Sequence, residues 1–141
     1  MYPDAYNKYQ KATLLFEKKR DQEALNELQK IINDSTTSNR IITVTYQNEQ
    51  KTPDEQSVSL QAAAYNMAGY ILMNHNEKDK ALFLLQKAIE ISPDFKLAIG
   101  NMNNLKKIRR LMINVHETIQ NKFKRNIDNI FKNIIIWRAI I

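Results

Sequence analysis

The chain has 141 residues, of which 43% are apolar and 26% are charged, and it contains only two glycines and three prolines. This length predicts one domain, and the scarcity of helix-breaking residues favours helices. Cysteine is absent, which excludes disulfides, thiolate metal sites and cysteine nucleophiles. Neither a secretory signal nor an apolar run long enough to span a bilayer is predicted, so we expect a cytoplasmic protein.

The net charge of +6 is unevenly distributed. Residues 1–95 carry 11 basic and 13 acidic side chains, whereas residues 96–141 carry 10 basic and 2 acidic ones. An electrostatic partner is therefore expected to meet the C-terminal third of the chain.

Two helices are predicted near the N-terminus. Apolar residues recur at steps of three and four between residues 6 and 17, and again between residues 24 and 32. The polar residues 18–21 join the two helices, and the short polar side chains of residues 35–39 favour turns that end the pair.

The middle of the chain gives two conflicting signals. Ile42, Val44 and Tyr46 alternate with threonines, which is typical of a strand, but an isolated hairpin is marginal in water, so a mobile loop fits equally well. The sequence Thr52-Pro53-Asp54-Glu55 resembles a helix-capping box, which predicts a helix that begins near Pro53 and ends at His75.

Two further helices follow. Apolar spacing predicts one at residues 80–91, which Ser92-Pro93-Asp94 ends. Beyond Phe95 a long amphipathic helix is predicted, with a break near Asn126 left open. Its polar face carries a basic patch, which consists of Lys106, Lys107, Arg110, Lys122 and Arg125.

Small and large residues alternate at set intervals between residues 65 and 93. The pattern is Tyr65-x2-Ala68-Gly69-x2-Leu72, followed by Ala81-x3-Leu85, Ala88 and Pro93. This segment resembles the 34-residue tetratricopeptide repeat (TPR). The small residues allow close approach of the two helices, and the large ones fill the spaces between them.

A weaker version of the same pattern lies 57 residues earlier. It aligns Ala12, Leu15, Ala24, Leu28 and Ile31, with Lys8 in the bulky aromatic position and Thr36 in the proline position. The spacing corresponds to one 34-residue repeat plus an insert of about 23 residues.

The resemblance implies an all-α fold, a TPR-like right-handed superhelix of antiparallel helix pairs with a long C-terminal capping helix. The predicted segments are a degenerate repeat at 1–37, an insert loop and helix extension at 38–61, a repeat at 62–95, a third-repeat-like or capping helix at 96–126, and a tail at 127–141.

In this family the first helix of each repeat lines a concave groove that binds a peptide. Placed on this template, the predicted groove residues are Tyr6, Tyr9, Thr13, Asn66, Tyr70, Met73 and Asn74. Positions that hold the cationic carboxylate clamp of chaperone-binding members carry Tyr9, Thr13, Met67, Leu97 and Asn101, so that clamp is absent.

The sequence therefore predicts a non-catalytic scaffold that binds a protein or peptide partner, without cofactor or metal. His75 and His116 are far apart and have no ligand spacing, and the two glycines are isolated within predicted helices. The alternative is an electrostatic adaptor, in which the basic helix contacts nucleic acid or an acidic membrane. A third hypothesis is a homo-oligomer that assembles through the end of the short stack.

Overall fold

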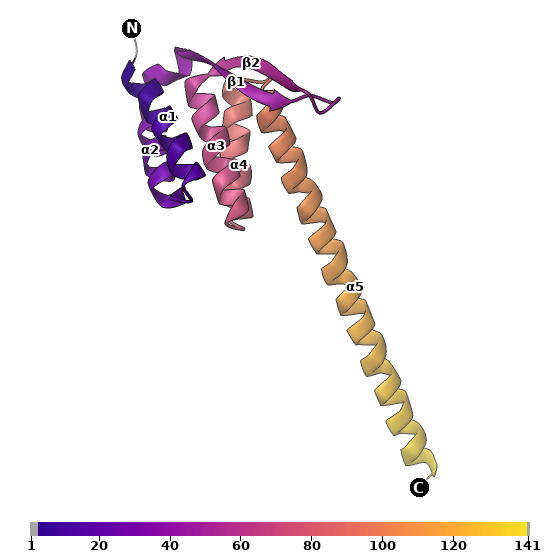
Figure 1. Cartoon of the computed structure of the whole chain (residues 1–141). Coiled ribbons are helices and arrows are strands. Elements are labelled where there is room, and N and C mark those ends of the chain that lie inside the picture. The colour runs from indigo at the N-terminus through magenta and orange to yellow at the C-terminus, as the bar shows by residue number, and fades with distance from the viewer. Residues whose placement is uncertain (1–2, 141) are drawn as a thin grey trace. The chain divides into compact units, whose positions relative to one another are not determined.

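The computed structural model describes residues 3–140, with side chains for residues 4–134. Its elements are α1 (Pro3–Glu17), α2 (Asp21–Asn33), the 3-10 helix η1 (Ser35–Asn39), β1 (Ile41–Gln47), β2 (Pro53–Ser59), α3 (Leu60–Asn74), α4 (Lys78–Ile91) and α5 (Lys96–Ile140) (Figure 1). The chain divides into two compact units, Met1–Leu105 and Lys106–Ile141. None of the helices in the described part of the chain has a stretch both long and apolar enough to cross a bilayer.

The apolar periodicity predicted α1, α2 and α4 correctly. Helices α1 and α2 cover the two N-terminal stripes, and α4 covers the stripe at residues 80–91. Ala12, Ala24 and Leu28 are fully buried where α1 and α2 pack. These stripes form one core with residues of α3, because each amphipathic helix must bury its apolar face against another element.

Small residues bring α3 and α4 into close contact, as the repeat pattern predicted. Ala68, Ala81 and Ala88 are at most 4% exposed. A Cβ atom on Gly69 would lie 2.9 Å from Leu85 Cγ and 3.3 Å from the Ala81 carbonyl oxygen. The approach of α4 therefore favours glycine at residue 69.

The turn within each helix pair has the same backbone hydrogen bonds, and the two turns lie 57 residues apart in the sequence. The Arg20 N–H donates to the Leu15 carbonyl at 2.8 Å, and the Glu77 N–H donates to the Leu72 carbonyl at 2.9 Å. Lys19 and Asn76 occupy the same left-handed position, with φ of 60° and 63°. Such a residue ends a helix in the Schellman arrangement. The identical turns support the predicted spacing of 57 residues between the two pairs.

The prediction of an all-α fold is wrong in one respect, because β1 and β2 form an antiparallel hairpin. Ile42 lies opposite Val58, and Tyr46 lies opposite Asp54. The alternation of Ile42, Val44 and Tyr46 therefore marks a strand, with these three side chains buried at 8–9% exposure.

The prediction that a helix begins near Pro53 is also wrong. The Thr52 N–H and hydroxyl both donate to Asn48 Oδ1, so Thr52 closes the hairpin turn instead of capping a helix. Pro53 is the first residue of β2, a position at which a strand tolerates a missing N–H. Helix α3 begins at Leu60, eight residues after Thr52, where the Ser59 side chain accepts from the Ala62 N–H.

The first ten residues of α5 belong to the first unit and cover the end of the second helix pair. Leu105 is 2% exposed and packs with Ala81 and Leu85. Within the second unit, all described side chains, residues 106–134, are exposed. The helix continues through Asn126 without a break. The side chains of residues 135–140 and all of residue 141, including the Trp137 ring of the predicted tail, lie outside the described residues.

Candidate functional site

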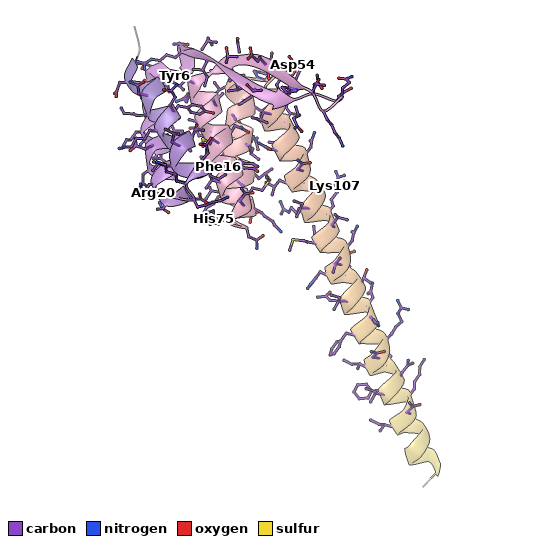
Figure 2. All side chains as sticks on the ribbon, in the orientation of Figure 1. Tyr6, Phe16, Arg20, Asp54, His75 and Lys107 are labelled. Atoms are coloured by element: carbon purple, nitrogen blue, oxygen red, sulfur yellow. The ribbon has the colours of Figure 1, made fainter. Side chains whose placement is uncertain are left out.

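The N-terminal groove residues border a hollow between α1 and β1. This hollow has a volume of about 420 Å³ and is lined by Tyr6, Tyr9, Gln10, Thr13, Leu14, Ile42 and Thr43. The Tyr6 and Leu14 side chains are 45% and 54% exposed, so apolar surface faces solvent there. Figure 2 shows Tyr6 and Asp54 at one end of the helix pairs and Arg20 and His75 at the other.

A second hollow adjoins the first along β1. It has a volume of about 450 Å³, and Tyr6, Ile42 and Thr43 belong to both linings. The remaining residues that line it are Asn39, Arg40, Ile41 and Leu60. We call the two together the α1–β1 hollow. Each is within the usual size range of a small ligand site, roughly 300–1,000 Å³.

Tyr9 is partly buried and packs against the helical core. Burial, with a smaller contribution from the neighbouring Tyr6 phenol, raises the pKa of the Tyr9 phenol to about 12. The Thr13 hydroxyl donates to the Tyr9 carbonyl at 3.1 Å, within α1. Tyr9 and Thr13 are partly buried beside the hollow, whereas Tyr6 is exposed.

The prediction is wrong for Asn66, which is not accessible. Asn66 is 5% exposed, and its Oδ1 accepts from Asn101 Nδ2 at 2.9 Å. The first turns of α5 therefore cover the place where a peptide amide was expected to bind. An asparagine predicted to face a ligand instead pairs α3 with α5.

Of the other predicted groove residues on α3, some are exposed at the surface and others pack against neighbouring side chains. The Tyr70 ring is 38% exposed and meets the Phe16 ring edge-on, with centroids 5.9 Å apart. Met73 packs partly buried against the cluster that contains Leu105, and Asn74 is exposed. None of the predicted groove residues on α3 lines the α1–β1 hollow.

Sequence reasoning missed Leu14, Ile42 and Thr43 as residues that line the site. Leu14 lies off the predicted groove-facing stripe of α1. Because residues 42–46 could equally form a loop, the sequence did not show which way Ile42 and Thr43 face. The period-two alternation was the signal that could have found Ile42 and Thr43, since it places successive side chains on opposite faces of a strand.

The hairpin is anchored to the junction of α4 and α5 by side-chain hydrogen bonds. Gln56 Nε2 donates to the Asp94 carbonyl at 2.6 Å, and Gln56 Oε1 accepts from the Lys96 N–H at 2.9 Å. The latter bond satisfies a first-turn amide of α5, which has no partner within its own helix. The Ser59 N–H donates to Ser92 Oγ at 3.4 Å, which adds a second anchor.

A second set of bonds joins the far end of the hairpin to α5. The Tyr46 hydroxyl donates to Asp54 Oδ2 and accepts from Lys96 Nζ, both at 2.9 Å. The Glu55 backbone N–H and the Tyr46 hydroxyl hold the pKa of Asp54 below its ordinary value. Hydrogen bonding to Tyr46 raises the pKa of Lys96, whose ammonium is thereby kept charged.

A larger polar hollow of about 930 Å³ lies beside this set of bonds. Its lining combines the hairpin turn with the first turns of α5 and is rich in side-chain amides: Tyr46, Gln47, Asn48, Glu49, Gln50, Asp54, Lys96, Leu97, Ile99, Gly100, Asn101, Asn103 and Asn104. Tyr46, Asp54 and Lys96 are bonded to one another, so this region holds the hairpin in place.

The predicted basic patch lies in the second unit. Its five residues are exposed on α5: Lys106, Lys107, Arg110, Lys122 and Arg125. Residues 106–134 carry eight basic and two acidic side chains. This surface can attract anions over short range, with an attraction that salt weakens.

Comparison with known families identifies one segment. Residues 62–95 match the model of the tetratricopeptide repeat. Neither the curated proteins nor the solved structures give a match to the chain. The matched segment contains the close contact at Gly69 and ends in the turn between α4 and α5. Residues 62–95 are therefore similar to a tetratricopeptide repeat, which supports a TPR-like helical repeat protein.

Proposed function

We propose that this protein is a non-catalytic scaffold that binds a segment of a partner protein in the α1–β1 hollow. Tetratricopeptide repeats generally serve as surfaces for protein–protein contact. The observation that carries the proposal is the pair of adjoining hollows around Tyr6, which three of the predicted groove residues border. The insert between the repeats supplies the opposite wall, so the site departs from a groove made of helices alone.

The residues around the hollow suit a protein segment. Tyr6 offers a wide ring with a polar tip, and such rings contribute large contact area at little conformational cost. Leu14 and Ile42 add apolar surface, and Gln10 and Thr13 add hydrogen-bonding groups. A hollow that combines apolar surface with a few polar groups is typical of ligand recognition.

A selection from a library of random displayed peptides, made on the full chain, tests the proposal. Tyr6→Ala should lower the enrichment of the selected peptides at least tenfold, because it removes the shared wall of both hollows. Phe83→Ala is the matched control, since Phe83 on α4 is 60% exposed and is absent from both linings. If Tyr6→Ala and Phe83→Ala lowered peptide enrichment equally, or if the unmodified chain enriched no peptide, this site would be excluded.

A second candidate function is electrostatic contact of the second unit with an anionic surface. The exposed basic residues of α5 are the observation that favours it. Binding to phosphate-bearing surfaces should fall steeply with salt and should weaken in Lys106→Ala combined with Arg110→Ala. Absence of retention on such a surface at low salt would remove this candidate.

A further inference from the structure

The two outer edges of the hairpin differ in how many of their backbone N–H groups have no hydrogen-bond partner in the described chain. The Leu60 N–H donates to the Arg40 carbonyl, and the Asn48 N–H donates to the Thr52 carbonyl. Since hydrogen-bonded pairs alternate along an antiparallel ladder, the even-numbered residues of β1 bond to β2. The odd-numbered residues of both strands therefore direct their N–H and C=O groups to the outer edges.

The outer edge of β2 has few free donors. Pro53 has no N–H, and the Glu55 N–H donates to Asp54 Oδ1 at 2.8 Å. The Ser59 N–H is bonded to Ser92 Oγ. This strand also carries two carboxylates, Asp54 and Glu55, and charge and proline are the usual means by which proteins protect a sheet edge.

The outer edge of β1 is open. Four outward N–H groups have no protein partner among the described residues, and they belong to Ile41, Thr43, Thr45 and Gln47. The strand contains no charged residue and no proline, and Ile41 is 65% exposed. Such an edge is a template for another strand.

The open edge runs beside the α1–β1 hollow. Ile42 and Thr43 line both parts of that hollow, and α1 forms the other wall. A residue of an added strand opposite Ile42 would point to the same face as the Ile42 side chain, which is the face toward the helices. The hollow is thus placed to receive alternate side chains of such a strand.

We propose that the partner segment binds as an added β-strand on the outer edge of β1. The segment pairs with up to seven residues, Ile41–Gln47. The inward side chain beside Ile42 is apolar or aromatic and enters the α1–β1 hollow, while the outward side chains lie beside Thr43 and Thr45. This inference rests on the proposed function and specifies the conformation and side-chain pattern of the partner.

A second copy of this chain fits the edge less well than an extended partner segment. The inward side chains of its own β1, Ile42, Val44 and Tyr46, are buried against its own helices. They cannot enter the hollow of the first copy. The hollow is filled only by a strand whose inward side chains are free.

Residue-resolved amide hydrogen exchange on the full chain tests the inference, with peptides from the random display library as probes. The bound peptide should slow the exchange of the Ile41, Thr43 and Thr45 amides at least tenfold. Exchange at Ser57, whose N–H faces the outer edge of β2, should not change.

A proline substitution gives an independent measurement. Thr43→Pro removes one outward N–H and should weaken peptide binding about tenfold, the value of one net hydrogen bond. Ser57→Pro is the control, because Ser57 lies directly opposite Thr43 and its N–H faces the other edge. Circular dichroism of both variants checks that the proline substitutions in the hairpin leave the helical content unchanged.

The outcomes separate this inference from the proposed function. Peptides that respond to Tyr6→Ala but leave the β1 amides unprotected would overturn strand addition and retain the hollow as the site. Failure to select any peptide would overturn both. A doubling of molar mass that Thr43→Pro abolishes would also overturn the inference, because the strand added would be that of a second copy.

Discussion

The close contact between α3 and α4 predicts opposite effects for the two glycines of the chain. Replacement of Gly69 by alanine places a Cβ 2.9 Å from Leu85 Cγ and 3.0 Å from Leu85 Cδ2. Carbon atoms pack best at about 3.5–4.0 Å, so these contacts are about 0.5 Å or more too short. Leu85 is fully buried, and the Ala81 carbonyl on the other side belongs to the helix backbone.

The expected size of the effect follows from two opposing contributions. Insertion of a methyl group into a packed core costs about 1–3 kcal/mol. Alanine in place of glycine within a helix stabilises the folded state by about 0.5–1 kcal/mol. Gly69→Ala should therefore lower the free energy of unfolding by roughly 1 kcal/mol, the difference between the midpoints of these ranges. Gly100→Ala should raise it by about 0.5–1 kcal/mol, because no atom lies within 4 Å of its added Cβ.

Urea unfolding followed by circular dichroism at the helical band measures both variants under one set of conditions. Thermal unfolding should shift in the same directions, by about 4 °C for each kcal/mol. If Gly69→Ala were as stable as Gly100→Ala, the close packing of α3 on α4 would be refuted.

Three further predictions concern single side chains. Burial favours the neutral phenol of Tyr9 and raises its pKa to about 12. The contribution of this phenol to stability is therefore complete below pH 10 and is lost between about pH 10 and 12. Tyr9→Phe should flatten the fall in unfolding free energy over that range, and an unaltered fall would count against the buried phenol. Hydrogen bonds from Lys11 and Lys30 lower the pKa of Glu27, so its contribution is present above the ordinary carboxyl pKa and is lost as pH falls through the lowered value. Glu27→Gln should lower stability at pH 7 and reduce its acid sensitivity in urea titrations, whereas equal stability at pH 7 would refute the pairing. Lys19 has a φ of 60°, so Lys19→Gly should stabilise the turn by up to about 1 kcal/mol in thermal unfolding, and a loss would show that the lysine side chain contributes there.

Helices and the repeat were predictable because their signals are local and periodic. A helix that buries one face repeats its apolar residues every three to four positions, and this spacing marked α1, α2, α4 and α5 in advance. The spacing of Ala68, Gly69, Ala81 and Ala88 identified the close contact between α3 and α4 for the same reason. Such patterns need no knowledge of which distant residues meet.

The sequence left the hairpin open as one of two alternatives because its signals are ambiguous at short range. Thr52-Pro53-Asp54-Glu55 satisfies the rules for the start of a helix, but Asn48 takes both donors of Thr52. That competition depends on a turn closed by a residue four positions earlier. The anchors of the hairpin, Gln56 to Asp94 and Tyr46 to Lys96, join residues at least 38 positions apart.

The candidate site was predicted in part. Tyr6, Tyr9 and Thr13 were predicted from the repeat template, and the structure places all three in the lining of the α1–β1 hollow. Asn66 was misplaced because the template does not show where α5 lies, and Asn101 covers it. The open edge of β1 could not be predicted, since it depends on the register of the hairpin and on the absence within residues 3–140 of another element bonded to the outward N–H groups of β1.

Photocrosslinking in the native cell tests the central claim most directly, namely that a partner protein binds in the α1–β1 hollow. A photoreactive phenylalanine replaces either Tyr6 or Phe83, two exposed aromatic positions. Our account predicts a discrete crosslinked product from residue 6, competed by the selected peptide, and none from residue 83. Crosslinking from residue 83 alone, or the same products from both positions, would contradict it.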